Sequence, residues 1–256
     1  MNHSCLSLSH MCTFAALVLA IITGSALSAG EASAPTPFPD PKNESAWPGT
    51  GPIRVFGWMV DNRSYFWTQR QAAHGAVVFV GDSLTGNWDA KQMAALFPKL
   101  KIANRGIGGD VSRGLLFRLK EDALDLDPKA LVVCIGSNDL SAHADPAGII
   151  ANIAAIIGQA RQHNATMPII LCTVAPRNSP VAPTKPGAHS DLNARITKFA
   201  AGQQHLALLD LVPVLGDDSG APVPANYTAD LLHLASPGYE RWAAALHPLM
   251  VRLGVE

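Results

Sequence analysis

Ser83 has the setting in this chain that most favours nucleophilic chemistry. It closes the run Val-Val-Phe-Val-Gly-Asp-Ser, residues 77–83, in which a fully apolar stretch ends abruptly. Such a stretch predicts a buried strand, and open α/β sheets bind ligands outside the carboxyl ends of their strands. We therefore expect the Ser83 hydroxyl at the mouth of a site. The structural alternative is that Asp82 and Ser83 only cap a helix.

Asp230 and His233 could supply the partners that a serine nucleophile needs. They are three residues apart, in Asp-Leu-Leu-His, just before a Ser-Pro pair at 236–237. An aspartate at this spacing can hold an imidazole in the tautomer that leaves the other ring nitrogen free as a base. Hydroxyl, imidazole and carboxylate together are the groups of serine hydrolysis. An isolated Asp-x-x-His pair is more often structural, so the hypothesis requires a fold that brings it to Ser83.

Two further polar segments follow other apolar runs. In Asn-Arg-Gly-Ile-Gly-Gly-Asp, residues 104–110, the glycines around Gly109 let a backbone approach a ligand and present N–H groups to it. In Gly-Ser-Asn-Asp, residues 136–139, the Asn138 amide could donate a hydrogen bond to a developing oxyanion. The alternatives are a turn capped by Asp110 and an Asx turn at Asn138. A phosphate-binding P-loop is disfavoured, because no Gly-Lys-Ser/Thr follows the glycines.

The elements that must position these residues alternate along the chain. Apolar runs predict strands at residues 76–80, 100–104, 130–135, 169–174 and 206–211. Helical spacing predicts helices at 61–73, 90–97, 112–124, 146–163 and 190–204, and a last one from Ser236 towards Leu253. Ser236 is the expected N-cap of this last helix, with Pro237 at its first position. The alternation predicts an α/β fold: a three-layer α/β/α sandwich around a five-stranded, mostly parallel sheet.

Charge and cysteine content exclude several classes of function. The chain has 256 residues, 48% of them hydrophobic, and a net charge of −1. This balance gives no sign of a nucleic-acid partner or of attraction to an anionic membrane. Cys134 and Cys172 lie within strand-like runs, so buried free thiols are favoured over a disulfide. No cysteine or histidine spacing is typical of a zinc site.

The first 53 residues differ in composition from the rest. An apolar run at 14–22 leads into small residues at 23–29, which predicts a signal peptide over residues 1–29. The run is shorter than the about 20 residues of a membrane span, so no stable span is expected after cleavage. No Lys or Arg precedes it, which leaves an uncleaved anchor or a misassigned start codon as alternatives. Residues 30–53 are rich in proline and alanine and predict a linker, followed by a catalytic domain over 54–256. We expect an exported protein, periplasmic or extracellular.

The polar segments occur in the order Ser83, Gly109, Asn138, then Asp230 and His233. In these motifs, and over about residues 54–253, the chain resembles the SGNH or GDSL superfamily of esterases and lipases. It looks closest to the branch that contains the catalytic subunits of platelet-activating-factor acetylhydrolase. The resemblance implies a flavodoxin-like α/β/α fold, in agreement with the alternation of elements. The α/β-hydrolase fold is disfavoured, because the chain has no Gly-x-Ser-x-Gly elbow.

The resemblance also implies roles for these residues. Ser83 would be the nucleophile, His233 the general base and then acid, and Asp230 the residue that orients His233. The oxyanion hole would combine the backbone N–H groups of Ser83 and Gly109 with the Asn138 side-chain amide. No metal or organic cofactor would be needed. Three neighbouring aspartates would instead fix the loops: Asp82, Asp110 and Asp139.

The expected reaction is hydrolysis of a carboxylic ester through an acyl-Ser83 intermediate. No amphipathic lid or long apolar surface segment is visible in the sequence, which favours short acyl groups, chiefly acetyl, on a carbohydrate or other small alcohol. A lysophospholipase or thioesterase of the same mechanism is one alternative, and a secreted, non-catalytic binding module is another. Trp88 and Arg177 could line the substrate site, or they could be a core residue and a solvated residue. The oligomeric state stays open.

Overall fold

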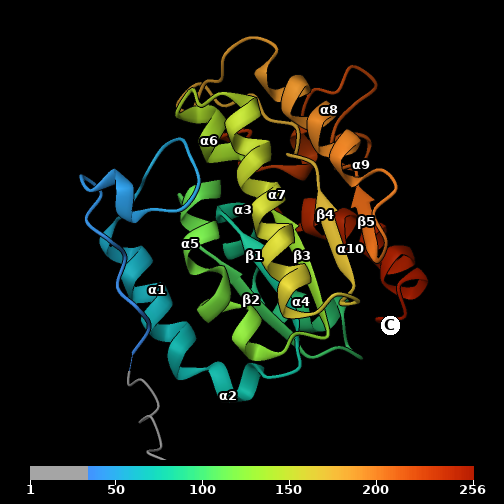
Figure 1. Ribbon diagram of the computed structural model, residues 1–256. Coiled ribbons are helices and arrows are strands. Elements are labelled where there is room, and N and C mark those ends of the chain that lie inside the picture. Colours follow the sequence, from blue (N-terminus) through green and yellow to red (C-terminus); the bar gives the residue numbers. More distant parts are fainter. Residues whose placement is uncertain (1–33) are drawn as a thin grey trace, which may run out of the picture. The chain divides into compact units, whose positions relative to one another are not determined.

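A five-stranded parallel sheet lies at the centre of the computed structural model, which describes residues 34–256 (Figure 1). The strands are β1 (Val77–Gly81), β2 (Ile102–Gly106), β3 (Ala130–Cys134), β4 (Ile169–Cys172) and β5 (Leu206–Leu209). Their order in the sheet is β2-β1-β3-β4-β5, and every neighbouring pair is parallel. The order changes direction between β1 and β3, and such switch points form ligand crevices at the carboxyl ends of strands.

The central strands are apolar throughout because both faces of the sheet are covered. All residues of β1 and β3 are buried. The strands are also in register, since Gly81 pairs with Gly106 of β2 and with Cys134 of β3. The segments that follow these three strands therefore begin at one level of the sheet. Cys134 and Cys172 are buried free thiols, as the sequence predicted.

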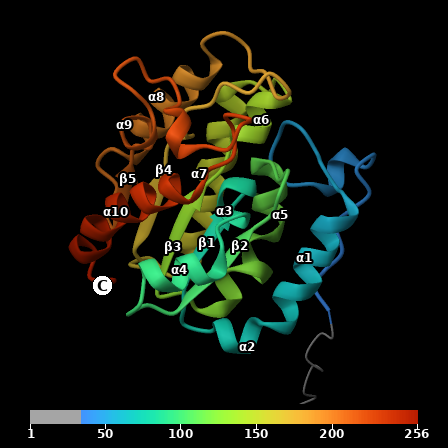
Figure 2. The same cartoon turned by 180° about the vertical axis from the view of Figure 1, so that it is seen from behind.

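Helices form the two outer layers. They are α1 (Gly57–Thr68), α2 (Arg70–Ala73), α3 (Ser83–Gly86), α4 (Ala90–Leu96), α5 (Ser112–Asp122), α6 (Ser137–Ser141), α7 (Pro146–His163), α8 (Ala188–Ala200), α9 (Val212–Leu215) and α10 (Ser236–Arg252). Short 3-10 turns occur at Glu44–Ala46, Leu124–Leu126 and Pro224–Asn226. Helices α5, α7 and α8 pack on one face of the sheet, and α4 and α10 on the other (Figures 1 and 2). The predicted three-layer α/β/α sandwich is thus confirmed.

Some helix boundaries differ from the sequence-based ones. The helix expected at 61–73 begins at Gly57 and is interrupted at Gln69, which separates α1 from α2. Ser236 is the first helical residue of α10 rather than its N-cap, and Ala235 takes the cap position. The Ser236 hydroxyl donates to Glu240 one turn later instead of capping. Within the described part of the chain, no helix has both the length and the apolarity that a membrane span requires.

The N-terminal segment, residues 34–56, is packed against the domain, which corrects the expectation of an extended linker over 30–53. Trp47 is buried against Phe117 of α5. The buried guanidinium of Arg113 donates to backbone carbonyls of this segment, at Glu44, Trp47, Pro48 and Gly51. Asn152 of α7 pairs with both the N–H and the carbonyl of Thr50. Apart from the short 3-10 turn at Glu44–Ala46, the segment has no helix or strand, and side chains satisfy several of its carbonyls instead. The expected signal peptide, 1–29, and residues 30–33 lie outside the described residues.

Candidate active site

Ser83 lies two residues after the end of β1, as the first residue of the short helix α3. Asp82 is the N-cap of this helix, and its carboxylate accepts the Leu84 N–H at 3.0 Å. Gly81 allows the end of β1 to lie close against β3, because a Cβ atom there would lie 2.2 Å from the Cys134 carbonyl oxygen. The helix-cap alternative and the site hypothesis therefore describe the same turn. Asp82 provides the cap, and Ser83 remains half-buried at the end of the strand.

His233 joins Ser83 to Asp230 in a continuous hydrogen-bonded chain. The His233 Nδ1 atom is 2.6 Å from Asp230 Oδ2, and His233 Nε2 is 2.9 Å from Ser83 Oγ. An ionised carboxylate only accepts hydrogen bonds, so Nδ1 carries the proton and Nε2 of the neutral ring is free to accept the Ser83 proton. The fold thus brings together residues 150 positions apart in the geometry of a nucleophile, a base and an orienting acid.

The loop that carries Asp230 and His233 is a tight turn. Burial opposes ionisation of Asp230, but hydrogen bonds from the His233 N–H, Thr228, the His233 ring and the Leu232 N–H outweigh it. They hold the pKa of Asp230 well below its usual range. Leu231 between them has a φ of +50°, in the left-handed region that leucine rarely adopts. Its carbonyl accepts the N–H of Asn178. The strained turn fixes the carboxylate under the imidazole.

Gly109 and Asn138, the residues expected to form an oxyanion hole, lie in the segments that follow β2 and β3, the two neighbours of β1. Gly109 follows β2 with a φ of +83°, a conformation that favours glycine. Among the turn and loop hydrogen bonds of residues 34–256, none uses the N–H of Ser83 or Gly109. Asn138 lies in α6 after β3, and its Nδ2 donates to the Asp110 carbonyl at 3.0 Å. This bond uses one of the two amide hydrogens and leaves the other for a ligand.

The three neighbouring aspartates are buried and hold loops. The Asp139 carboxylate accepts from the N–H and the hydroxyl of Ser112, which ties α6 to α5. Asp110 accepts the Val111 N–H and an Arg118 N–H. Burial raises the pKa of Asp82 to about 7 and that of Asp139 to about 6. Burial also raises the pKa of Asp110, and the adjacent Arg118 opposes that rise.

Arg118, which the sequence did not single out, connects the ends of β1 and β2 with the loop that carries Asp110. Its side chain is fully buried in α5. It donates to Gly81 O at the end of β1, to Arg105 O in β2, and to the carboxylates of Asp110 and Asp122. One guanidinium thereby fixes the approach to Ser83 and the end of the Gly109 loop. The sequence did contain a signal for this role: Arg118 lies at an interior position of the predicted 112–124 helix, and a buried arginine requires hydrogen-bond or charge partners.

Trp88 and Arg177 both have structural contacts. Trp88 is 2% exposed and packs on Tyr239 and Trp242 of α10, so it belongs to the core. Arg177 is half-buried and donates to the Ser137 carbonyl and hydroxyl, and to Ser141. It therefore anchors the 175–188 loop on α6, beside Asn138.

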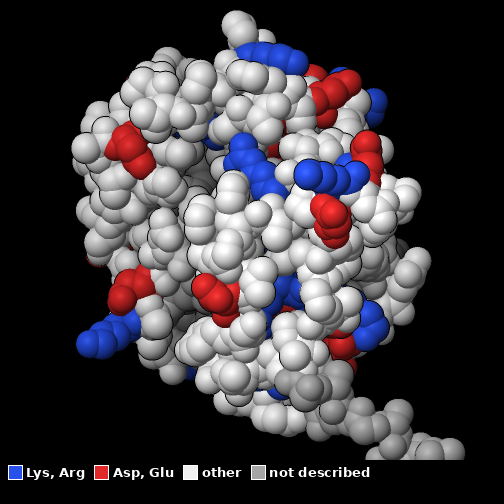
Figure 3. All heavy atoms as spheres, turned by 90° about the vertical axis from the view of Figure 1, so that its left-hand side faces the viewer, with Lys and Arg blue, Asp and Glu red and all other residues white. Residues whose placement is uncertain are grey.

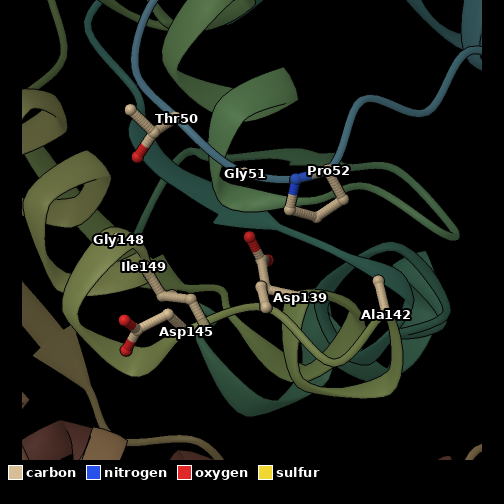
Figure 4. Close-up of a pocket in the computed structure, with 9 residues that line it drawn as sticks. Thr50, Gly51, Pro52, Asp139, Ala142, Asp145, Gly148 and Ile149 are labelled. Atoms are coloured by element: carbon tan, nitrogen blue, oxygen red, sulfur yellow. The ribbon is translucent and has the colours of Figure 1, made fainter.

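A cavity of about 460 Å³ lies between the N-terminal segment and helices α6 and α7 (Figure 4). Its lining includes Thr50, Pro52, Asp139 and Ile149. Asp139 faces Pro52 across this space (Figure 4). Because both of its oxygens accept hydrogen bonds from Ser112, its carboxylate is committed to the loop contact. One lining residue, Asp139, follows Asn138 in the sequence, but the lining contains neither Ser83 nor His233.

Comparisons with known proteins agree with this geometry. The model of the GDSL-like Lipase/Acylhydrolase family matches residues 79–241. Platelet-activating factor acetylhydrolase IB subunit alpha2 of Homo sapiens is 31% identical over 185 residues, covering 69% of this chain and 76% of that protein. The human alpha1 subunit is 27% identical over 224 residues, covering 87% and 90%. The crystal structure of a GDSL-like lipase from Bacteroides thetaiotaomicron has 25% identity and a TM-score of 0.64, covering 73% of this chain and 96% of that one.

Proposed function

Since the chain belongs to the GDSL-like lipase/acylhydrolase family and is a carboxylic ester hydrolase, we propose that it removes short acyl groups, chiefly acetyl, through an acyl-Ser83 intermediate. The observation that carries the proposal is the hydrogen-bonded chain from Ser83 Oγ through His233 to Asp230. The preference for acetyl is supported by the acetylhydrolase activity in the names of its relatives.

In the first step, Ser83 Oγ attacks the ester carbonyl while His233 Nε2 takes the hydroxyl proton. Asp230 accepts the Nδ1–H bond and stabilises the imidazolium that forms. The N–H groups of Ser83 and Gly109 and the Asn138 amide stabilise the tetrahedral oxyanion. His233 then gives its proton to the departing alcohol oxygen, and the acyl group stays on Ser83.

In the second step, water attacks the acyl-Ser83 carbonyl. His233 removes a proton from the water and afterwards returns it to Ser83 Oγ, so the carboxylic acid leaves and the enzyme is regenerated. The same oxyanion donors serve both steps. The cycle uses only groups of this chain and water, so the proposal includes no metal or organic cofactor.

A chain-length series tests the proposal. We expect purified protein to hydrolyse p-nitrophenyl acetate faster than the octanoyl and palmitoyl esters. A maximum at long chains would favour the lysophospholipase or thioesterase alternative. Ser83→Ala should abolish turnover and labelling by a serine-directed organophosphonate, whereas Ser190→Ala, at an exposed serine on α8, should change neither. Failure of the wild-type protein to hydrolyse any ester would favour a non-catalytic binding module instead.

We also propose that the protein is exported. The support is the apolar run at 14–22 and the small residues at 23–29 that follow it. Expression of the full chain in a bacterial host should release a protein whose N-terminal sequence begins near residue 30. Recovery of the intact N-terminus from the membrane fraction would support an uncleaved anchor instead.

A further inference from the structure

Two exposed aromatic side chains lie beside the loop that contains Gly108 and Gly109. Trp58 is 52% exposed and Phe56 is 39% exposed. Their rings are stacked, with centroids 4.5 Å apart and an interplanar angle of 17°. The Trp58 Nε1–H donates to the Gly108 carbonyl at 2.9 Å, which fixes the indole against the loop. We call these two side chains the Phe56–Trp58 pair.

The glycine backbone of residues 108–109 contacts both this pair and the segment that carries Ser83. A Cβ atom placed on Gly109 would lie 3.6 Å from the Phe56 ring. A Cβ atom placed on Gly108 would lie 3.9 Å from the Ser83 Cβ. The loop thus has the aromatic rings on one side and Ser83 on the other. The two glycines therefore bring the rings next to the segment that holds Ser83.

The N-terminal segment holds the pair in place. Arg54 lies just before Phe56 and donates to the Gly109 carbonyl at 3.5 Å. Further back, Arg113 and Asn152 bind the backbone of residues 44–51 from α5 and α7. The rings are therefore oriented before a ligand arrives, which lowers the entropic cost of binding. Both residues precede residues 79–241, which the family model matches.

Polar groups flank the pair along α1. At 3.6 residues per turn, Asp61 and Asn62 lie between Trp58 and the next exposed aromatic on that side, Tyr65. Asp61 is exposed, and the Asn62 amide donates to the Trp58 carbonyl. Figure 3 shows the side of the molecule that carries α1, with charges of both signs scattered over it. A lipid surface requires a continuous apolar face, and this arrangement does not provide one.

We propose that the Phe56–Trp58 pair is the subsite for the alcohol part of the ester, and that this part is a sugar ring; the inference rests on the proposed esterase function. The C–H bonds on one face of a pyranose carry partial positive charge and match the negative face of an aromatic ring. The hydroxyl groups at the edge of the sugar can meet the polar side chains beside the pair. An acetyl group is smaller than one face of such an aromatic ring, which assigns the stacked pair to the alcohol side.

The test compares two acetyl esters that differ only in the alcohol. Methyl 6-O-acetyl-glucopyranoside carries a sugar ring, whereas vinyl acetate carries an alcohol too small to reach the pair. We expect Trp58→Ala and Phe56→Ala each to lower the ratio of kcat/KM, sugar ester over vinyl acetate, about tenfold. Trp58→Phe keeps a ring and loses the bond to Gly108, so it should retain most of the ratio. Tyr65→Ala, an exposed aromatic two turns away on α1, is the matched control and should leave the ratio unchanged.

The outcomes separate the subsite from the esterase function. Hydrolysis of vinyl acetate but not of the sugar ester by the wild-type protein would overturn the subsite and leave the esterase intact. An unchanged ratio in Trp58→Ala and Phe56→Ala would also overturn it, as would an equal fall on both substrates, which would mean that the pair only supports the loop. A 2-acetyl phospholipid serves as a third substrate. If Trp58→Ala and Phe56→Ala lose activity on this phospholipid alone, the pair binds a lipid alcohol instead. No turnover of any ester would refute the proposed function itself.

Discussion

Replacement of Arg118 by methionine should destabilise the protein strongly, because it leaves a buried carboxylate without a cation. Arg118 is the one cation hydrogen-bonded to Asp110 among residues 34–256, and both side chains are buried. Asp122 would keep its contact with Arg63. Removing one partner of a buried ion pair costs about 3–5 kcal/mol. We expect the free energy of unfolding of Arg118→Met to fall by about that amount.

The loss should also depend on pH. Without Arg118, Asp110 loses the charge and the hydrogen bond that most oppose the effect of burial, and keeps only the Val111 N–H bond on that side, so its folded-state pKa rises further. A folded-state pKa above the unfolded value means that stability is present at low pH and is lost as pH rises through that interval. The difference between wild type and Arg118→Met should therefore be larger at pH 8 than at pH 5. Urea unfolding at the two pH values measures it.

Arg195→Met is the matched control for this experiment. Arg195 also pairs with an aspartate, Asp191, but its side chain is 43% exposed in an i, i+4 pair on α8. Exposed helical pairs of this kind contribute about 0.3–0.5 kcal/mol. If Arg118→Met unfolds within about 1 kcal/mol of wild type, or if its deficit shrinks as pH rises, the reasoning about the buried charges is wrong.

Three further predictions concern the site. Asp230→Asn should lower kcat by up to about 10⁴, as in serine protease triads, because the amide no longer selects the His233 tautomer. Asn138→Ala should lower kcat about 10²–10³ by removing an oxyanion donor. Asp82→Asn should flatten the pH dependence of unfolding between about pH 4 and 7, because the raised pKa of Asp82 makes the wild type lose up to about 1.4 kcal/mol per pH unit there. Steady-state kinetics on p-nitrophenyl acetate measures the first two, and urea unfolding from pH 4 to 8 measures the third.

The first of these predictions has a matched control, and the other two have outcomes that would contradict them. Asp191→Asn changes an exposed acid on α8 and should leave kcat within twofold of wild type. For Asn138→Ala, a rise in KM at constant kcat would mean that the amide binds the ground state as strongly as the transition state. A slope for Asp82→Asn as steep as that of wild type would show that other groups, such as Asp139, cause the pH dependence.

The layers of the fold and the site geometry were predictable because local sequence signals and the fold agree. The apolar runs gave all five strands to within two residues at their starts, and α7 matched the predicted 146–163. The parallel register then places the segments after β1, β2 and β3 at one edge of the sheet. Ser83, Gly109 and Asn138 each follow one of these strands, so sequence position alone was enough to group them.

Contacts that depend on long-range pairing were not predictable. Leu231 carries a positive φ although no glycine or asparagine marks the turn, because the hydrogen bonds around Asp230 impose it. Arg118 and Arg113 are polar residues in helix α5 whose partners lie in distant segments. Helical periodicity identifies the face on which such a residue lies, but it does not identify the carbonyl or carboxylate that compensates its burial.

The N-terminal segment shows how such contacts affect function. Its prolines and lack of periodicity are typical of a linker, and that interpretation would detach it from the catalytic domain. Arg113 and Asn152 instead bind its backbone, and the chain then continues directly into Phe56 and α1 beside the Gly109 loop. The same contacts that make the segment part of the fold therefore determine where the Phe56–Trp58 pair lies. A substitution that weakens the contacts of Arg113 should consequently change the preference for the alcohol part of the ester more than the rate of hydrolysis of a small acetyl ester.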